Sequence, residues 1–145
     1  MGVQNPACIF CKIVSRTIAA DIVHEDAECI GFLDNRPLFP GHVLLCPREH
    51  FETLTDLPVP LTGPMMFRTQ LLAKAVEAAV TAEGTFIAIN NRISQTVPHL
   101  HIHVVPRRHR DGLKGFFWPR QQYRGNDDRE AVRAAIEREM KKLLG

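Results

Sequence analysis

The chain has 145 residues, of which 45% are hydrophobic, and it carries 18 basic against 16 acidic side chains. This length supports one hydrophobic core, so we expect one compact domain. A net charge of +2 argues against binding to long nucleic acid by bulk electrostatics. No stretch approaches the roughly 20 apolar residues that span a bilayer, and no basic region precedes an apolar run at the N-terminus. We therefore expect a cytoplasmic protein that does not enter a membrane.

The first half of the chain predicts a short helix followed by strands. Residues 8–18, CIFCKIVSRTI, indicate a turn leading into a short helix, and residues 21–26 and 29–33 indicate two strands joined by a turn at EDAE. A loop rich in proline and glycine then leads into HVLLCP, residues 42–47, which predicts a third strand closed by Pro47. In that strand His42, Leu44 and Cys46 should face one way, with Val43 and Leu45 facing the other.

The second half of the chain predicts one long helix, two more strands and a terminal helix. Apolar residues recur at helical spacing from Leu61 to Ala82, with Pro64 suited to the first turn and Gly84 just past the end. Acidic residues begin the terminal helix and lysines end it, as its dipole prefers. The other predicted elements are strands at residues 85–90 and 96–107, an extended segment at 112–126 and the terminal helix at 127–145.

Three histidines stand at alternate positions in the stretch TVPHLHIHVVPR, residues 96–107. In a strand, His99, His101 and His103 share one face, and the apolar residues between them face the other. Alternate residues lie roughly 7 Å apart, close enough to surround one phosphate or to divide between a metal and a substrate. The stretch therefore predicts a strand with an imidazole face; the alternative is that His101 and His103 are surface polar residues.

The segments HLHIHVV, PGHVLLCPREH and CIFCKIV occur together, and together they resemble the histidine triad (HIT) superfamily of nucleotide hydrolases and transferases. The resemblance runs from about Cys8 to Arg107. It implies an α+β fold with an antiparallel sheet of about five strands, one long helix and a C-terminal helix. We place the HIT domain at residues 1–110, with a tail and helix at residues 111–145 packed on the same domain.

The loop before the triad departs from the family pattern. Similar proteins have a glycine-containing stretch ending in AGQ, whereas NNRISQTV is shorter and lacks those glycines. The block around His42 and QTV resemble the Fhit-like dinucleoside polyphosphate hydrolases, while CKIV and IAADIVHED resemble the Hint-like phosphoramidases. The sequence therefore leaves both substrate classes open, with a purine as the expected base.

The resemblance implies a nucleophilic role for His101. A neutral imidazole can attack an α-phosphate if its other ring nitrogen donates a proton to an acceptor, and water would then hydrolyse the nucleotidyl-histidine. His103 would donate a hydrogen bond to the phosphoryl oxygens, His42 could approach the same charge, and Thr96 would assist the leaving group.

A second set of residues implies a structural zinc ion. Cys8 and Cys11 have the C-x-x-C spacing of a metal or redox motif, although they could also be small core residues. Zinc-bearing HIT proteins are similar in adding a downstream histidine and the first histidine of the triad, here His50 and His99. Four protein ligands leave no open position, so zinc would be structural.

The nucleotide contacts are also implied by the resemblance. Phe32 and Ile9 or Ile13 would enclose the base, and Asp34 would accept hydrogen bonds from the ribose hydroxyls. Asn90 and Gln95 would line the phosphate side with Thr96. Each of these residues could instead have an ordinary place in the core or in a turn.

Three functions remain open: a HIT hydrolase, a nucleotide-binding regulatory module with little turnover, and a zinc protein whose histidines bind a redox metal. The family resemblance further implies a homodimer that buries the apolar face of the long helix. The segment GLKGFFWPRQQY, residues 112–123, holds the only tryptophan and tyrosine. We expect Trp118 and Arg120 to reach toward a leaving group, whereas Phe116 and Phe117 could simply pack on their own subunit.

Overall fold

The computed structural model describes residues 3–114 and 120–145. The chain divides into two compact units, Met1–Asp111 and Gly112–Gly145. The first unit holds all the predicted site residues of the HIT domain. None of the helices in the described residues combines the length and the apolar character needed to cross a membrane.

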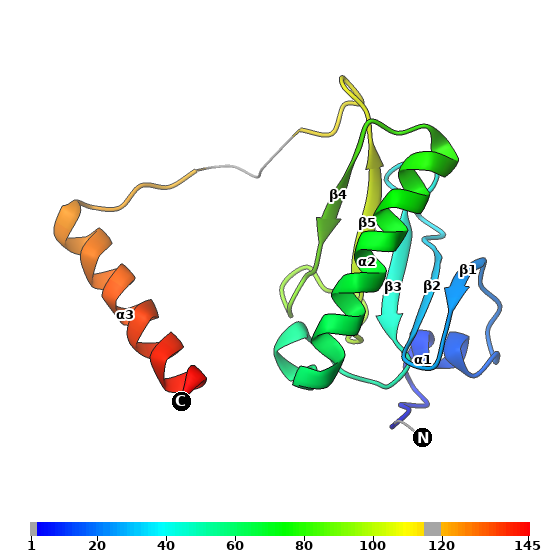
Figure 1. The fold of residues 1–145 in the computed structure, drawn as a ribbon, viewed down its shortest axis with the longest axis horizontal. Helices are drawn as coiled ribbons and strands as arrows, with labels where there is room; N and C mark the ends of the chain where they lie inside the picture. The colour runs from blue at the N-terminus through cyan, green and yellow to red at the C-terminus, as the bar shows by residue number, and fades with distance from the viewer. Residues whose placement is uncertain (1–2, 115–119) are drawn as a thin grey trace. The chain divides into compact units, whose positions relative to one another are not determined.

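The first unit is built on a five-stranded antiparallel sheet with the strand order β1-β2-β3-β5-β4 (Figure 1). This confirms the predicted α+β fold and the predicted sheet. Strands β1 and β4 form the two edges. The strands are β1 (Ile22–Glu25), β2 (Cys29–Leu33), β3 (Val43–Pro47), β4 (Gly84–Ala88) and β5 (Ile102–Arg107).

Each face of the sheet packs against its own helix. The long helix α2 (Val59–Val80) lies across one face, where Val43, Leu45 and Val104 meet its buried residues (Figure 1). The short helix α1 (Ile9–Val14) packs on the opposite face against Leu44 and Cys46. Alternate residues of β3 therefore enter different cores, as the strand periodicity predicts.

Helix α2 differs from its predicted limits at both ends. It begins at Val59 with a proline in its first two positions, so Pro64 lies inside the helix rather than in its first turn. The helix ends where Thr81 takes a left-handed conformation with φ 54°. Gly84 is consequently the first residue of β4 and does not cap the helix.

The triad segment forms a strand only in part. Strand β5 starts at Ile102, so the prediction of strand geometry from residue 96 was wrong for His99 and His101. The N–H of His99 donates to Val97 and that of Leu100 donates to Phe51, so neither N–H is available for a ladder with β3. His101 and His103 nevertheless have neighbouring rings, with centroids 5.0 Å apart.

The second unit contains helix α3 (Asn126–Leu144), close to the predicted terminal helix. Asp127 and Asp128 stand in its first turn and Lys141 and Lys142 in its last. Ion pairs join Arg133 to Glu130 and Glu137. Phe116, Phe117 and Trp118 lie outside the described residues. The packing of residues 111–145 on the HIT domain stays a prediction.

Candidate functional site

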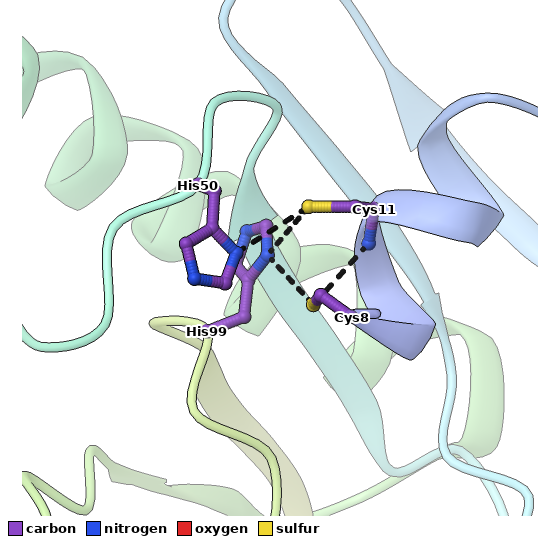
Figure 2. Close-up of side chains that lie close together, drawn as sticks. All are labelled: Cys8, Cys11, His50 and His99. Carbon is purple, nitrogen blue, oxygen red and sulfur yellow. Dashed lines mark hydrogen bonds between the residues drawn. The ribbon is translucent and has the colours of Figure 1, made fainter. Parts of the chain in front are cut away.

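Four predicted metal ligands meet at the N-terminal end of α1 (Figure 2). Cys8 caps α1 and Cys11 stands one turn later, while His50 follows β3 and His99 precedes β5. Their ligand atoms all lie within 4.8 Å of one another. Four residues from three separate segments of the chain thus point toward one common centre.

The spacing of these atoms fits a tetrahedral zinc site. His99 Nδ1 lies 3.4 Å from Cys8 Sγ and 3.6 Å from Cys11 Sγ, and His50 Nδ1 lies 3.4 Å from Cys11 Sγ. Zinc bonds of 2.3 Å to sulfur and 2.0–2.1 Å to nitrogen place S and N ligands about 3.6 Å apart in a tetrahedron. The donor set is therefore compatible with zinc.

The protonation of His99 also fits a metal ligand. His99 Nε2 lies 2.8 Å from the carbonyl oxygen of Pro47, so Nε2 carries the proton and Nδ1 presents a lone pair to the thiols. Burial, together with the neighbouring His50 and His101, lowers the pKa of His99 to about 4. Burial raises the pKa of the Cys11 thiol, so metal binding there would release a proton.

His101 is held with one ring nitrogen free. Its Nδ1 lies 2.7 Å from the carbonyl oxygen of His99, an acceptor only, so Nδ1–H donates and Nε2 keeps its lone pair. Burial lowers the pKa of His101 below its usual 6.5, and this outweighs the opposing hydrogen bond to His99 and the charge of Asp34. The neutral, nucleophilic form is thus favoured near pH 7.

His42 and His103 form a hydrogen-bonded pair. The N–H of Leu38 donates to His42 Nδ1 at 3.1 Å, so His42 carries its proton on Nε2. That nitrogen donates to His103 Nδ1 at 2.9 Å, which leaves the proton of neutral His103 on Nε2. Burial and the neighbouring His101 and His42 lower the pKa of His103 to about 4, and burial also lowers that of His42. Both rings act as neutral donors.

A cavity of about 170 Å³ is lined mainly by residues of α1, β2 and the segments that follow them. Its lining includes the four residues predicted to hold the base and the ribose, namely Ile9, Ile13, Phe32 and Asp34. Asp34 links the cavity to the histidines, because its Oδ2 lies 3.7 Å from His42 Nε2.

The residues predicted for the phosphate side lie outside the lining of this cavity. Gln95 Oε1 accepts from the N–H of Arg92 at 2.7 Å, and its Nε2 donates to the carbonyl of Glu52 at 2.6 Å. Both ends of the amide thus fasten the loop before the triad. Thr96 is exposed and Asn90 is half-buried, and neither lines the cavity as far as the described residues show.

The same loop turns without glycine. Arg92 and Ser94 adopt left-handed conformations, with φ 68° and 58°, which cost a residue with a side chain free energy. Asn91 Oδ1 accepts from the N–H of Leu54 at 3.0 Å, so the loop is tied down on both sides of Arg92. Hydrogen bonds thereby hold a conformation for which glycine is usually used.

The sequence prediction missed Phe10. Its ring meets His101 edge to face, with centroids 5.1 Å apart and planes at 86°, and also contacts Phe32 and His99. The only signal in the sequence was an aromatic residue inside the C-x-x-C motif. Apolar residues in a short helix are usually core, so this signal could not have distinguished Phe10 from its neighbours.

Comparisons with known proteins agree with this architecture. A family model described as the HIT domain matches residues 15–110. An uncharacterized HIT-like protein of Mycobacterium tuberculosis is 38% identical over 130 residues, which cover 86% of this chain and 87% of that protein. The adenylylsulfatase HINT3 of Arabidopsis thaliana is 33% identical over 108 residues, 73% of this chain and 55% of that protein.

A solved structure extends the likeness to the metal. The zinc-bound histidine triad family protein of Mycobacterium smegmatis is 36% identical, with a TM-score of 0.71, and the match covers 94% of this chain and 97% of that one. Sequence motifs, fold and relatives lead to the same conclusion: the chain belongs to the HIT family.

Proposed function

We propose that the protein is a hydrolase or nucleotidyl transferase that attacks the α-phosphate of a purine nucleotide derivative through His101. The observation that carries this proposal is the hydrogen bond from His101 Nδ1–H to the His99 carbonyl, which reserves Nε2 for attack. The substrate class consists of nucleoside phosphoramidates, nucleotidyl anhydrides and dinucleoside polyphosphates. The similarity to an adenylylsulfatase supports an adenylyl group as the part transferred.

The reaction has two steps in this proposal. His101 Nε2 forms a bond to the α-phosphorus, and the bond from phosphorus to the leaving group breaks with its electron pair on the leaving group. Water then attacks the phosphorus of the nucleotidyl-histidine, and the bond from phosphorus to Nε2 breaks with its electron pair on Nε2, so the imidazole leaves as the neutral ring. The proton lost by the water passes to the solvent. Throughout both steps, the Nδ1–H bond to His99 stabilises the positive charge that develops on His101.

His103 and His42 stabilise the phosphoryl oxygens in this proposal. His103 Nε2–H donates to an oxygen whose negative charge grows as phosphorus becomes five-coordinate. His42 fixes His103 in that tautomer through the 2.9 Å hydrogen bond, and Asp34 supports His42 from 3.7 Å. In this proposal Thr96, which is exposed, assists the leaving group. This role requires Thr96 to approach the bound substrate.

The cavity supports binding of the nucleoside portion. Ile9, Ile13 and Phe32 offer apolar surface to a flat base, and the Asp34 carboxylate can accept hydrogen bonds from the two ribose hydroxyls. Asn90 and Gln95 belong to the phosphate side of the proposed site, where Gln95 acts by holding the loop.

We further propose that Cys8, Cys11, His50 and His99 hold one structural zinc ion. Zinc would supply a fixed link between α1, the segment after β3 and the triad segment. His99 is the ligand that matters for chemistry, because its carbonyl oxygen orients His101 while its ring faces the thiols.

A homodimer completes the proposal. Met66, Phe67 and Ile87 are 58%, 57% and 44% exposed, and all three line one hollow that joins α2 to the edge strand β4. A second copy related by a two-fold axis could cover this apolar face beside the edge strand β4. We propose a second copy of the chain as the partner that covers this hollow, because exposed apolar residues of α2 and of the edge strand β4 line it together.

A substrate screen tests the proposed function. The wild type is incubated with adenosine phosphoramidate, adenylyl sulfate and diadenosine polyphosphates, and the nucleotide products are identified. We expect release of AMP from at least one substrate, and loss of this turnover with retained nucleotide binding in His101→Ala. Tight binding without turnover in the wild type would instead identify a nucleotide-binding module.

A further inference from the structure

We propose that Phe10 is a positioning residue that sets the angle of the His101 ring for attack. This inference rests on the proposed function of His101. Phe10 is neither a metal ligand nor a group that reacts, but its ring meets His101 at 5.1 Å and 86°. Edge-to-face contacts of this kind have a preferred geometry, so they favour one orientation of the two rings.

One hydrogen bond is not enough to fix His101. The bond from Nδ1–H to the His99 carbonyl holds one corner of the ring, but the imidazole can still pivot about that corner. Phe10 and His103 contact the ring at centroid distances of 5.1 and 5.0 Å. These two contacts therefore limit the tilt of the His101 ring and so set the direction of Nε2.

Phe10 itself is held firmly. It is 7% exposed, lies between the metal ligands Cys8 and Cys11 in α1, and packs against Phe32 with ring centroids 5.3 Å apart. Its ring also meets His99 at 5.9 Å. The position of α1 is thus transmitted to His101 by two routes: through His99 and its carbonyl, and directly through Phe10.

A purely structural role for Phe10 makes a different prediction. Phe10 also lines the nucleoside cavity, so its loss could weaken binding or stability without changing the reacting ring. Phe32 provides the matched control, because it lines the same cavity and its ring contacts Phe10. A positioning role lowers the rate at saturating substrate, whereas a role in binding raises KM.

The experiment compares Phe10→Leu, Phe10→Tyr and Phe32→Leu in the zinc-loaded protein. Steady-state kinetics give kcat and KM with the substrate found in the screen. Histidine-specific 15N NMR without nucleotide reports whether His101 keeps a single tautomer with the proton on Nδ1. Zinc content is measured for every variant, and Phe10→Met replaces Phe10→Leu if the latter loses zinc.

We expect Phe10→Leu to lower kcat by about 10- to 100-fold, because a small misplacement of a reacting group costs this much. Its His101 signals should broaden or report both tautomers. Phe10→Tyr keeps the ring and should retain kcat and the Nδ1–H tautomer. Phe32→Leu should mainly raise KM.

The proposal is overturned if Phe10→Leu keeps the wild-type kcat, if Phe32→Leu loses kcat equally, or if the His101 signals are unchanged in Phe10→Leu. Absence of turnover in the wild type would refute the proposed function instead. The NMR comparison needs no substrate, so it still decides whether Phe10 orients His101.

Discussion

At the scale of single residues, the site is defined by which nitrogen of each imidazole carries a proton. Backbone groups set the tautomers of three histidines. The carbonyls of Pro47 and His99 accept the ring protons of His99 and His101, and the N–H of Leu38 donates to His42 Nδ1, which places the proton of His42 on Nε2. His103 takes its tautomer from another side chain, His42. Main-chain partners cannot rotate away, so the site is organised before a substrate arrives.

The low pKa of His103 makes a prediction about stability. Its folded pKa of about 4 lies below the ordinary value of 6.5, so the unfolded chain takes up the proton first as pH falls. The stability that the neutral ring contributes is present above pH 6.5 and is lost between 6.5 and 4. His103→Gln, which can still accept a hydrogen bond from His42, should lose less stability than the wild type between pH 7 and pH 5.

Urea unfolding of both proteins at the two pH values measures this difference. The two proteins share every other titratable group, so the contributions of groups away from His103 cancel in the comparison. Acidic residues such as Asp26 do not interfere: burial opposes their charge, but hydrogen bonds from Arg68 and His24 keep the pKa of Asp26 well below its usual range. An equal or larger loss in His103→Gln would show that the assigned pKa direction is wrong.

At the scale of elements, periodicity predicted much of the fold. The faces of β3 were correct, because each alternate residue enters a different core. The limits of α2 differ from the prediction by about two residues at each end, because Pro60 also suits a helix start and because Thr81 adopts a left-handed conformation that ends the helix before Gly84. Residue patterns reveal buried faces but not where backbone hydrogen bonds change partner.

The same limit applies to the site. The four proposed metal ligands could be predicted from the sequence because they belong to recognisable motifs, and the same is true of the cavity residues around Phe32. The start of β5 and the role of Gln95 depend on bonds to Phe51 and Glu52, residues more than 40 positions away. No local sequence pattern identifies hydrogen-bond partners this far away in the chain.

The cluster of Cys8, Cys11, His50 and His99 gives a prediction for helix α1. Cys8→Ser should lose most of its zinc and lower the melting temperature by about 5 °C or more, since losing some 2 kcal/mol shifts a domain of this size by that amount. Cys46→Ala is the control: Cys46 is fully buried in the same core but is not part of the cluster. Metal analysis and thermal unfolding are measured on both variants.

Cys46→Ala should keep one zinc per chain even if it is less stable. The zinc assignment fails if carefully purified wild type holds far less than one equivalent, or if Cys8→Ser melts at the wild-type temperature with full zinc content. These results would return Cys8 and Cys11 to the role of small core residues.

At the scale of the whole molecule, the first unit presents an apolar surface next to the edge strand β4 of its sheet. Phe67→Glu places a charge at the centre of the hollow between α2 and β4, where a symmetric interface would bury it twice. We expect the wild type to be a dimer and Phe67→Glu a monomer by light scattering. Val59→Glu, on a more exposed residue of α2 outside the hollow, should remain a dimer. A monomeric wild type would refute the dimer.

The nucleotidyl-histidine is the central claim of the mechanism, and intact-mass analysis of a chilled, rapidly quenched reaction tests it most directly. The wild type should gain the mass of one nucleotidyl group, and this gain should map to a peptide that contains His101. His101→Ala should show neither the adduct nor turnover. Unchanged turnover in His101→Ala, or an adduct that maps to another residue, would contradict the mechanism.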